Sequence, residues 1–270
     1  MTEIAYYEAK PNVKIESIEG LLKAIKEFEK EVGCDDDRRL YFRGDGCWSH
    51  GLKPSVGRVN VYKHAGKQLR GFSKDQEHDL LHRFQRYAYI HERRCLSEWE
   101  ALFVGRHHGL PVRLLDWTAN PLVALYNAVQ CEDKRTQDGA LWVFKRVKNG
   151  HDFDVIEAIK KDKSPFDLKG VKIIYPVYVD QRMLAQSGCF TIQDNPQKGL
   201  EDYKAGVESD IEALRKWEVP KCKNKSALLE DLQRMSIDHR NLYPDLDGLA
   251  KGLWHLEVIK RGIASGEAGN

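Results

Sequence analysis

The side chains best suited to chemistry are concentrated in one stretch, RHHGLPVRLLDW, at residues 106–117. This stretch sets two adjacent histidines, His107 and His108, beside Arg113 and Asp116 among apolar residues. A histidine that faces a cleft can donate a hydrogen bond or act as a general acid and base, with its tautomer fixed by a carboxylate such as Asp116. The alternative is that both histidines only bond loop carbonyl groups, and the sequence leaves both interpretations open.

A metal ion held by the histidine pair is disfavoured. Neighbouring side chains of a strand point to opposite faces, so His107 and His108 are not expected to bind one ion, and further ligands would have to come from a distance. The cysteines are scattered and lack the spacing of a zinc site; they are Cys34, Cys47, Cys95, Cys131, Cys189 and Cys222. We therefore expect no metal, and reduced thiols of the kind found in cytoplasmic proteins.

Arg113 and Asp116 lie within the apolar run RLLDW. If this run is extended, the two side chains point to opposite faces and cannot pair with each other, so each needs its own partner. Burying a charged group is costly unless it is paired and hydrogen-bonded. We expect structural ion pairs here, with an anion-binding arginine as the alternative.

A second candidate is the run FRGDG, from Phe42 to Gly46, which follows the apolar strand pattern of residues 40–42. Arg43 at a strand end, flanked by glycines that let a ligand approach the backbone, suits recognition of a phosphate or carboxylate by a planar guanidinium group. A simple glycine turn explains the same residues. A third polar group, with Gln186 before Gly188, could orient a ligand through its amide or could simply end a helix.

The elements that must position these side chains can be placed from periodicity and capping signals. Helices are expected from Ser17 to Gly33, in two pieces over residues 73–105, after the Asn120-Pro121 start through residue 130, over residues 226–235 and after Pro244. Strands are expected at residues 13–16, 40–42, 112–115, 139–146, 170–179, 188–193 and 211–219. Early helices, late strands and the lack of GxGxxG predict an α+β fold, with a mixed, mainly antiparallel central sheet flanked by helices.

Charge and hydropathy exclude some classes of protein. The chain has 43 Lys and Arg against 41 Asp and Glu, a formal net charge of only +2. Bulk charge therefore does not indicate nucleic-acid or anionic-membrane binding. The N-terminus lacks the apolar run of a signal peptide and no window reaches the length of a membrane span, so we expect a soluble, cytoplasmic protein without a membrane partner.

Together these stretches resemble the FRG domain, a family named for its Phe-Arg-Gly motif and found mostly in bacteria and their mobile elements. The matching segments are Phe42-Arg43-Gly44, then Leu52, Pro54, Gly57 and Arg58, then HHGLPVRLLDWTANPLVAL, then Arg182, Gln186, Gly188 and Phe190, and finally NLYPDLDGLA. The resemblance divides the chain into an N-terminal strand and helix at 1–37, the domain at 38–252, and a helix end with a frayed tail at 253–270. Arg106 departs from the glutamine that is frequent in the family, and Val112 from the threonine.

An aromatic-Arg-Gly motif at the end of an early strand is also similar to the NAD-binding frame of ADP-ribosyltransferases. This resemblance implies NAD as co-substrate and a dinucleotide contact by Arg43, with Gly44, Asp45, Arg113 and Phe190 completing the binding site. The implied catalytic and polar contacts are His107, His108, Asp116 and Gln186. Stacking on nicotinamide would come from Tyr41, Phe42, Trp117 or Phe190, and a late glutamate from Glu201, Glu212, Glu218 or Glu230.

The resulting hypothesis is a nucleotide-binding, ADP-ribosyltransferase-like effector of bacterial stress, toxin or antiphage systems, with a protein or nucleic acid as acceptor. One alternative is a non-catalytic module that binds a nucleotide, a nucleic acid or a partner protein. Another is a nuclease or other hydrolase that uses His107 and His108. The sequence leaves open whether the protein is an enzyme.

Overall fold

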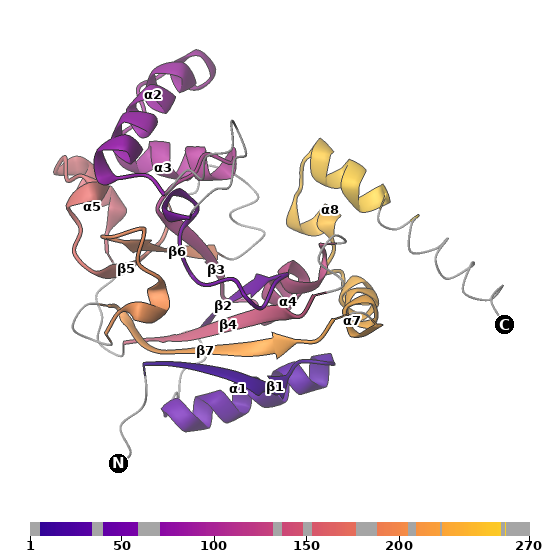
Figure 1. Cartoon of the computed structure of the whole chain (residues 1–270). Helices are drawn as coiled ribbons and strands as arrows, with labels where there is room; N and C mark the ends of the chain where they lie inside the picture. The colour runs from indigo at the N-terminus through magenta and orange to yellow at the C-terminus, as the bar shows by residue number, and fades with distance from the viewer. Residues whose placement is uncertain are drawn as a thin grey trace, which may run out of the picture.

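The computed structural model describes residues 6–33, 40–58, 71–131, 137–147, 153–176, 188–204, 209–221, 223–254 and 257. These residues form an α+β fold with one mixed sheet and flanking helices (Figure 1), as the sequence predicts. Among the described residues, no helix combines the length and the apolar character that a membrane crossing requires.

The sheet of the described chain has seven strands in the order β1-β7-β4-β2-β3-β6-β5. Their bounds are β1 Tyr7–Lys14, β2 Leu40–Asp45, β3 Leu114–Thr118, β4 Gly139–Arg146, β5 Val171–Ile174, β6 Gly188–Gln193 and β7 Ile211–Val219. β1 runs parallel to β7, whereas all the other neighbours are antiparallel. The prediction of a mixed, mainly antiparallel sheet is therefore confirmed.

The helices begin at the capping residues that the sequence contains. Ser17, Ser73, Ser97 and Asn120 each accept a backbone N–H of the first turn that follows them. The helices are α1 Ile18–Val32, α2 Lys74–Glu92, α3 Glu98–His107, α4 Pro121–Val129, α5 Val155–Lys160, α7 Lys223–Arg234 and α8 His239–Leu242, with short 3-10 turns at Ser55–Gly57, Pro165–Asp167 and Leu200–Asp202. Residues 246–254 are also helical.

Alternation along the strands shows which face of the sheet the helices cover. On β4, Leu141 and Val143 pack with α1, α4 and α7, while Trp142 and Phe144 pack into a separate cluster on the opposite face. On β3, Leu114 packs with α2, α3 and α5. Phe42 belongs to the same cluster as Leu141 and Val143, and it pairs with Thr118 on β3. Thr118 points to the same face of the sheet as Leu114. The helices α1, α4 and α7 and the helices α2, α3 and α5 therefore cover the same face of the sheet at different places.

Four strands differ from their predicted bounds. The first strand lies at Tyr7–Lys14 rather than at residues 13–16 because it pairs in parallel with β7, and β2 continues beyond residue 42 to Asp45 because it pairs with β4 over its whole length. The expected extended segment 112–115 lies two to three residues further along as β3, because the chain is still completing the turn after α3 at Leu110. Of the expected strand 170–179, the structure shows β5, and residues 177–179 lie outside the described residues.

Candidate functional site

A cavity of about 670 Å³ is lined by residues from β2, β3 and β6 and by the facing parts of α3 and α4. Its volume lies within the usual range of small-molecule sites. The wall brings together six of the residues singled out from the sequence: Arg43, Gly44, Asp45, His107, Asp116 and Phe190. These residues are up to 147 positions apart in the chain, so the convergence is a product of the fold.

Beside the cavity, the backbone pairing between β2 and β3 is short. β2 and β3 share one registered pair, Phe42 with Thr118, whereas β2 and β4 share six. Beside this short ladder, Arg43 donates a hydrogen bond from Nη1 to the backbone oxygen of Asp116 at 2.9 Å. The same nitrogen lies 3.4 Å from Oδ2 of Asp116. The arginine side chain therefore bridges the two strands where their backbone pairing has stopped.

Asp116 is held between two guanidinium groups. Arg106, in the last turn of α3, donates from Nε to both carboxylate oxygens at 3.1 Å and from Nη2 to Oδ2. Burial raises the pKa of Asp116, but Arg106 and then Arg43 outweigh it and lower the pKa to about 2. Asp116 in turn raises the pKa of Arg106. Burial lowers the pKa of Arg43, and the Asp116 charge opposes that effect.

Arg43 keeps donors for a ligand. In the part of the chain that the structure describes, its hydrogen bonds all leave from Nη1. Nε and Nη2 thus form an unused edge of the kind that recognises a phosphate or carboxylate. The wall also contains Asp45, so two arginines face two carboxylates and the net charge of these four groups is zero. Anion recognition here would come from the direction of the donors rather than from bulk charge.

The histidine pair lies at a helix end, which corrects the strand geometry assumed from the sequence. His107 is the last residue of α3, His108 is its C-cap, and Gly109 follows with a φ of 82°. The two rings meet edge to face with centroids 4.8 Å apart. His107 lines the cavity, whereas His108 is exposed and lies outside the wall. Of the two histidines that the hydrolase hypothesis uses, His107 therefore lines the cavity and His108 does not.

Arg113 is placed away from the cavity. Its Nε and Nη2 donate to the Glu77 carboxylate at 3.0 and 2.6 Å, and its guanidinium carbon lies 4.4 Å from the centre of the Phe166 ring. The side chains of Arg113 and Glu77 are 0% and 2% exposed. The expected structural ion pair is present, and Arg113 and Asp116 have separate partners as predicted. An NAD contact by Arg113 is not possible in this conformation because no part of the side chain reaches the surface.

The glycine of the Phe-Arg-Gly motif has a packing reason. A Cβ at Gly44 would lie 1.8 Å from the backbone oxygen of Ala124 and 2.7 Å from the nitrogen of Ala128, so only glycine lets β2 approach α4 so closely. From the sequence we expected that Gly44 lets a ligand approach the backbone. The structure instead explains this glycine by the close packing of β2 against α4, although Gly44 does border the cavity. Asp45 accepts the Cys47 N–H at 3.0 Å and lies 2.9 Å from Nδ1 of His50.

The other residues that were predicted to contact NAD are found at the cavity only in part. Phe42, Trp117 and Phe190 border the cavity but are almost fully buried, and Gln186 lies outside the described residues. The described wall contains no glutamate. Among the four glutamates proposed by order along the chain, Glu201 accepts the Leu52 N–H and Glu212 pairs with Lys145.

Some wall residues were missed in the sequence. One is Asn127, which lies four residues after Val123 and therefore on the same side of α4, so this spacing could have indicated that the two residues line one cavity. Tyr243 is another; it adds a partly exposed aromatic ring, but its position after α8 depends on long-range packing.

Comparison with protein-family models matches residues 38–137 to the FRG domain. The match begins just before β2 and ends just before β4, so it contains Phe42-Arg43-Gly44 and the whole of RHHGLPVRLLDW. This part of the chain is thus similar to the FRG domain, and the predicted extent of 38–252 stays a prediction. Searches of curated proteins and of solved structures found no match.

Proposed function

We propose that the cavity binds a phosphate-bearing nucleotide, with NAD as the candidate, and that the protein is an ADP-ribosyltransferase-like effector. The observation that supports this most is Arg43, which lines the cavity and is anchored on Asp116 through Nη1, while its Nε and Nη2 donate to none of the described residues. The neighbouring carboxylates suit a ligand that combines anionic phosphates with a cationic ring, as NAD does. The role in stress or antiphage defence rests on the family resemblance.

In the proposed reaction, Arg43 holds the pyrophosphate and fixes the ribose near His107 and Asp45. The bond between ribose C1′ and the nicotinamide nitrogen breaks, and nicotinamide leaves with the bonding electron pair. A nucleophilic atom of the acceptor bonds to C1′ and loses its proton to His107. Positioning and electrostatic stabilisation of the cation-like ribose would supply the rate enhancement.

The adjacent histidines provide a matched pair of variants for the test. Binding is measured by calorimetry with NAD, ADP-ribose, AMP and adenosine, and transfer by label from NAD to lysate and by released nicotinamide. We expect the phosphate-bearing ligands to bind and adenosine to bind at least about tenfold more weakly, the loss of one strong polar contact. Arg43→Lys should weaken NAD binding by a similar factor, because lysine lacks the bidentate fork.

His107→Ala should abolish transfer while His108→Ala retains it, because only His107 lines the cavity. The proposal is overturned if no phosphate-bearing nucleotide binds, or if His107→Ala and His108→Ala behave alike.

A non-catalytic nucleotide-binding module is the second candidate. It is favoured by the absence of a glutamate from the described wall of the cavity, since the resemblance to ADP-ribosyltransferases implies one. In this case NAD or another nucleotide raises the melting temperature and Arg43→Lys reduces that rise, while no nicotinamide is released. Nucleotide binding measured together with nicotinamide release therefore separates the two candidates.

A further inference from the structure

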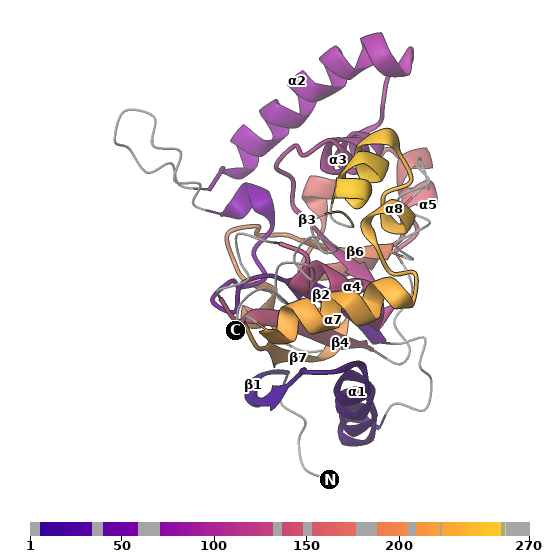
Figure 2. The same ribbon diagram turned by 90° about the vertical axis from the view of Figure 1, so that its right-hand side faces the viewer.

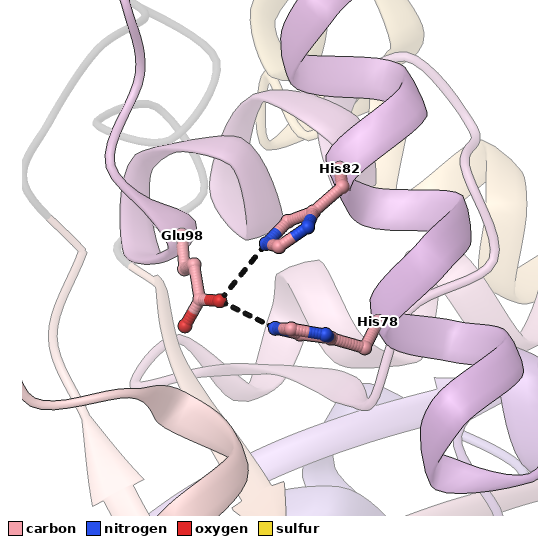
Figure 3. A group of neighbouring side chains, drawn as sticks. All are labelled: His78, His82 and Glu98. Atoms are coloured by element: carbon pink, nitrogen blue, oxygen red, sulfur yellow. Dashed lines mark hydrogen bonds and ion pairs between the residues drawn. The ribbon is translucent and has the colours of Figure 1, made fainter.

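A cluster of three metal-ligating side chains lies where α2 meets α3, apart from the cavity. His78 and His82 are one helical turn apart on α2, and Glu98 is the first residue of α3. Figure 3 shows both imidazole rings turned toward the Glu98 carboxylate from the same side of α2. The i,i+4 spacing of two histidines was the sequence signal for this cluster, and the expectation of no metal was argued without it.

The distances within the cluster are close to those around a metal ion. Nε2 of His78 lies 2.7 Å from Oε1 of Glu98, and Nε2 of His82 lies 3.3 Å from the same oxygen. All the ligand atoms lie within 4.8 Å of one another. Ligands about 2.0–2.1 Å from a tetrahedral zinc ion are about 3.3 Å apart, so small side-chain rotations would admit the ion.

The surroundings orient the carboxylate and one ring. Ser164 donates from Oγ to the second oxygen of Glu98 at 2.5 Å, which leaves Oε1 for the histidines. Phe166 packs edge-on against the His78 ring at 4.8 Å. Burial raises the pKa of Glu98, but hydrogen bonds from Ser164, His78 and His82 outweigh it and lower the pKa, so the carboxylate stays ionised. Such outer contacts are typical of metal sites.

The cluster is also accessible to an ion from solvent. The side chains of His78 and His82 are 41% and 50% exposed, and that of Glu98 is 23% exposed. An ion could therefore enter without unfolding, and one coordination position would face water. Two of the positive charges on or beside α2 are compensated, since Arg83 pairs with Asp79 and Arg113 with Glu77.

We propose that His78, His82 and Glu98 form a binding site for a divalent transition-metal ion of the zinc type, with water as the fourth ligand. Both histidines would bind through Nε2, with the ring proton moved to Nδ1. The ion joins α2, which projects from the body of the molecule in Figure 2, to the start of α3. Glu98 and His107 are nine residues apart on α3, about 13 Å along the helix, so the ion lies outside the nucleotide cavity.

The test is titration of the full chain, freed of metal by chelator and dialysis, with ZnCl₂ in a calorimeter. We expect one strong site per chain. His82→Ala and Glu98→Gln should each weaken it by at least about 100-fold, since the first removes a direct ligand and the second replaces an anionic carboxylate ligand by a neutral amide. Glu98→Gln keeps the size of the side chain at the start of α3 and removes only its charge. His91→Ala is the matched control, because His91 is an exposed histidine at the far end of the same helix; it should bind like the wild type.

Cobalt substitution and melting identify the ligands. Co²⁺ should give the intense visible bands of a low-coordinate ion without the near-ultraviolet thiolate band that cysteine ligands produce. Saturating Zn²⁺ should raise the melting temperature of the wild type and of His91→Ala, but not of His82→Ala. Circular dichroism of each apo variant shows that it is folded. Lack of a strong site, a thiolate band, or equal binding by His82→Ala and the wild type would overturn the proposal.

Discussion

The buried pair of Glu77 and Arg113 permits a quantitative prediction. Glu77→Gln keeps the size of the side chain but leaves the Arg113 charge, at 0% exposure, without a counter-charge. Glu77 accepts two hydrogen bonds from Arg113, at 3.0 and 2.6 Å. The glutamine oxygen can accept one of them without its ionic character, whereas the NH2 group that replaces the other oxygen is a donor and cannot accept from Arg113. Breaking a buried pair from one side costs about 3–5 kcal/mol of unfolding free energy, a large part of the roughly 5–15 kcal/mol that domains have.

The assay is urea unfolding followed by circular dichroism, supported by thermal melting. At about 2 °C per kcal/mol for a chain of this size, the melting temperature of Glu77→Gln should fall by about 6–10 °C. The double variant Glu77→Leu with Arg113→Met should lie within about 1 kcal/mol of the wild type, because apolar replacement of both partners removes the unpaired charge. Its nucleotide binding should be intact, because neither residue lines the cavity.

Two results would refute this reasoning. One is a loss of less than about 1 kcal/mol for Glu77→Gln, which would mean that Arg113 is solvated or finds another partner. The other is a double variant that is as unstable as the summed single variants, since pairing predicts strong non-additivity. Loss of NAD binding in a folded, stable double variant would instead restore Arg113 as a ligand contact.

Three further outcomes follow from the geometry of the cavity. Gly44→Ala should cost about 3 kcal/mol or more in urea unfolding, because the new Cβ would lie 1.8 Å from the Ala124 oxygen; a near-wild-type value would show that α4 moves freely. Gly109→Ala, with a φ of 82° and no atom within 4 Å, should cost only about 1–2 kcal/mol of backbone strain, and a larger loss would contradict the open space. The pKa of Asp116 is lowered to about 2 from about 3.9 in unfolded chains, so its ionic stabilisation is complete above about pH 5 and is lost as the pH falls toward 2. The difference in unfolding free energy between the wild type and Asp116→Asn should therefore shrink over that pH range, and a constant difference would exclude the ionic contribution.

Local signals predicted most of the elements. Ser17 with Gly33 bounds α1, and Asn120 with Pro121 starts α4, because capping depends on a few neighbouring residues. The α+β class also followed from the order of helices and strands. The end of α3 was harder, because the run of His107, His108 and Gly109 before a proline is a helix C-terminus that was interpreted as extended.

The composition of the site depended on long-range pairing. Arg43 and Asp116 could each be singled out from their neighbours, but their contact joins β2 to β3 across 73 positions. The partner of Arg113 is Glu77, 36 positions away on α2, and nothing in either local sequence specifies the other. For that reason the sequence could predict that Arg113 needs a partner without predicting which residue supplies it, or that the pair lies outside the cavity.

Arg106 takes most of the hydrogen bonds of the Asp116 carboxylate and so affects which donors Arg43 has left at the cavity. A neutral side chain such as glutamine at this position would leave Arg43 as the main partner of Asp116. With Arg106 present, three close contacts to the carboxylate come from α3 and only one longer contact, at 3.4 Å, comes from Arg43. Arg43 is instead fixed chiefly through the backbone oxygen of Asp116, an interaction that uses one nitrogen. Arg106 therefore favours an Arg43 guanidinium whose Nε and Nη2 donate to none of the described residues and can bind a phosphate.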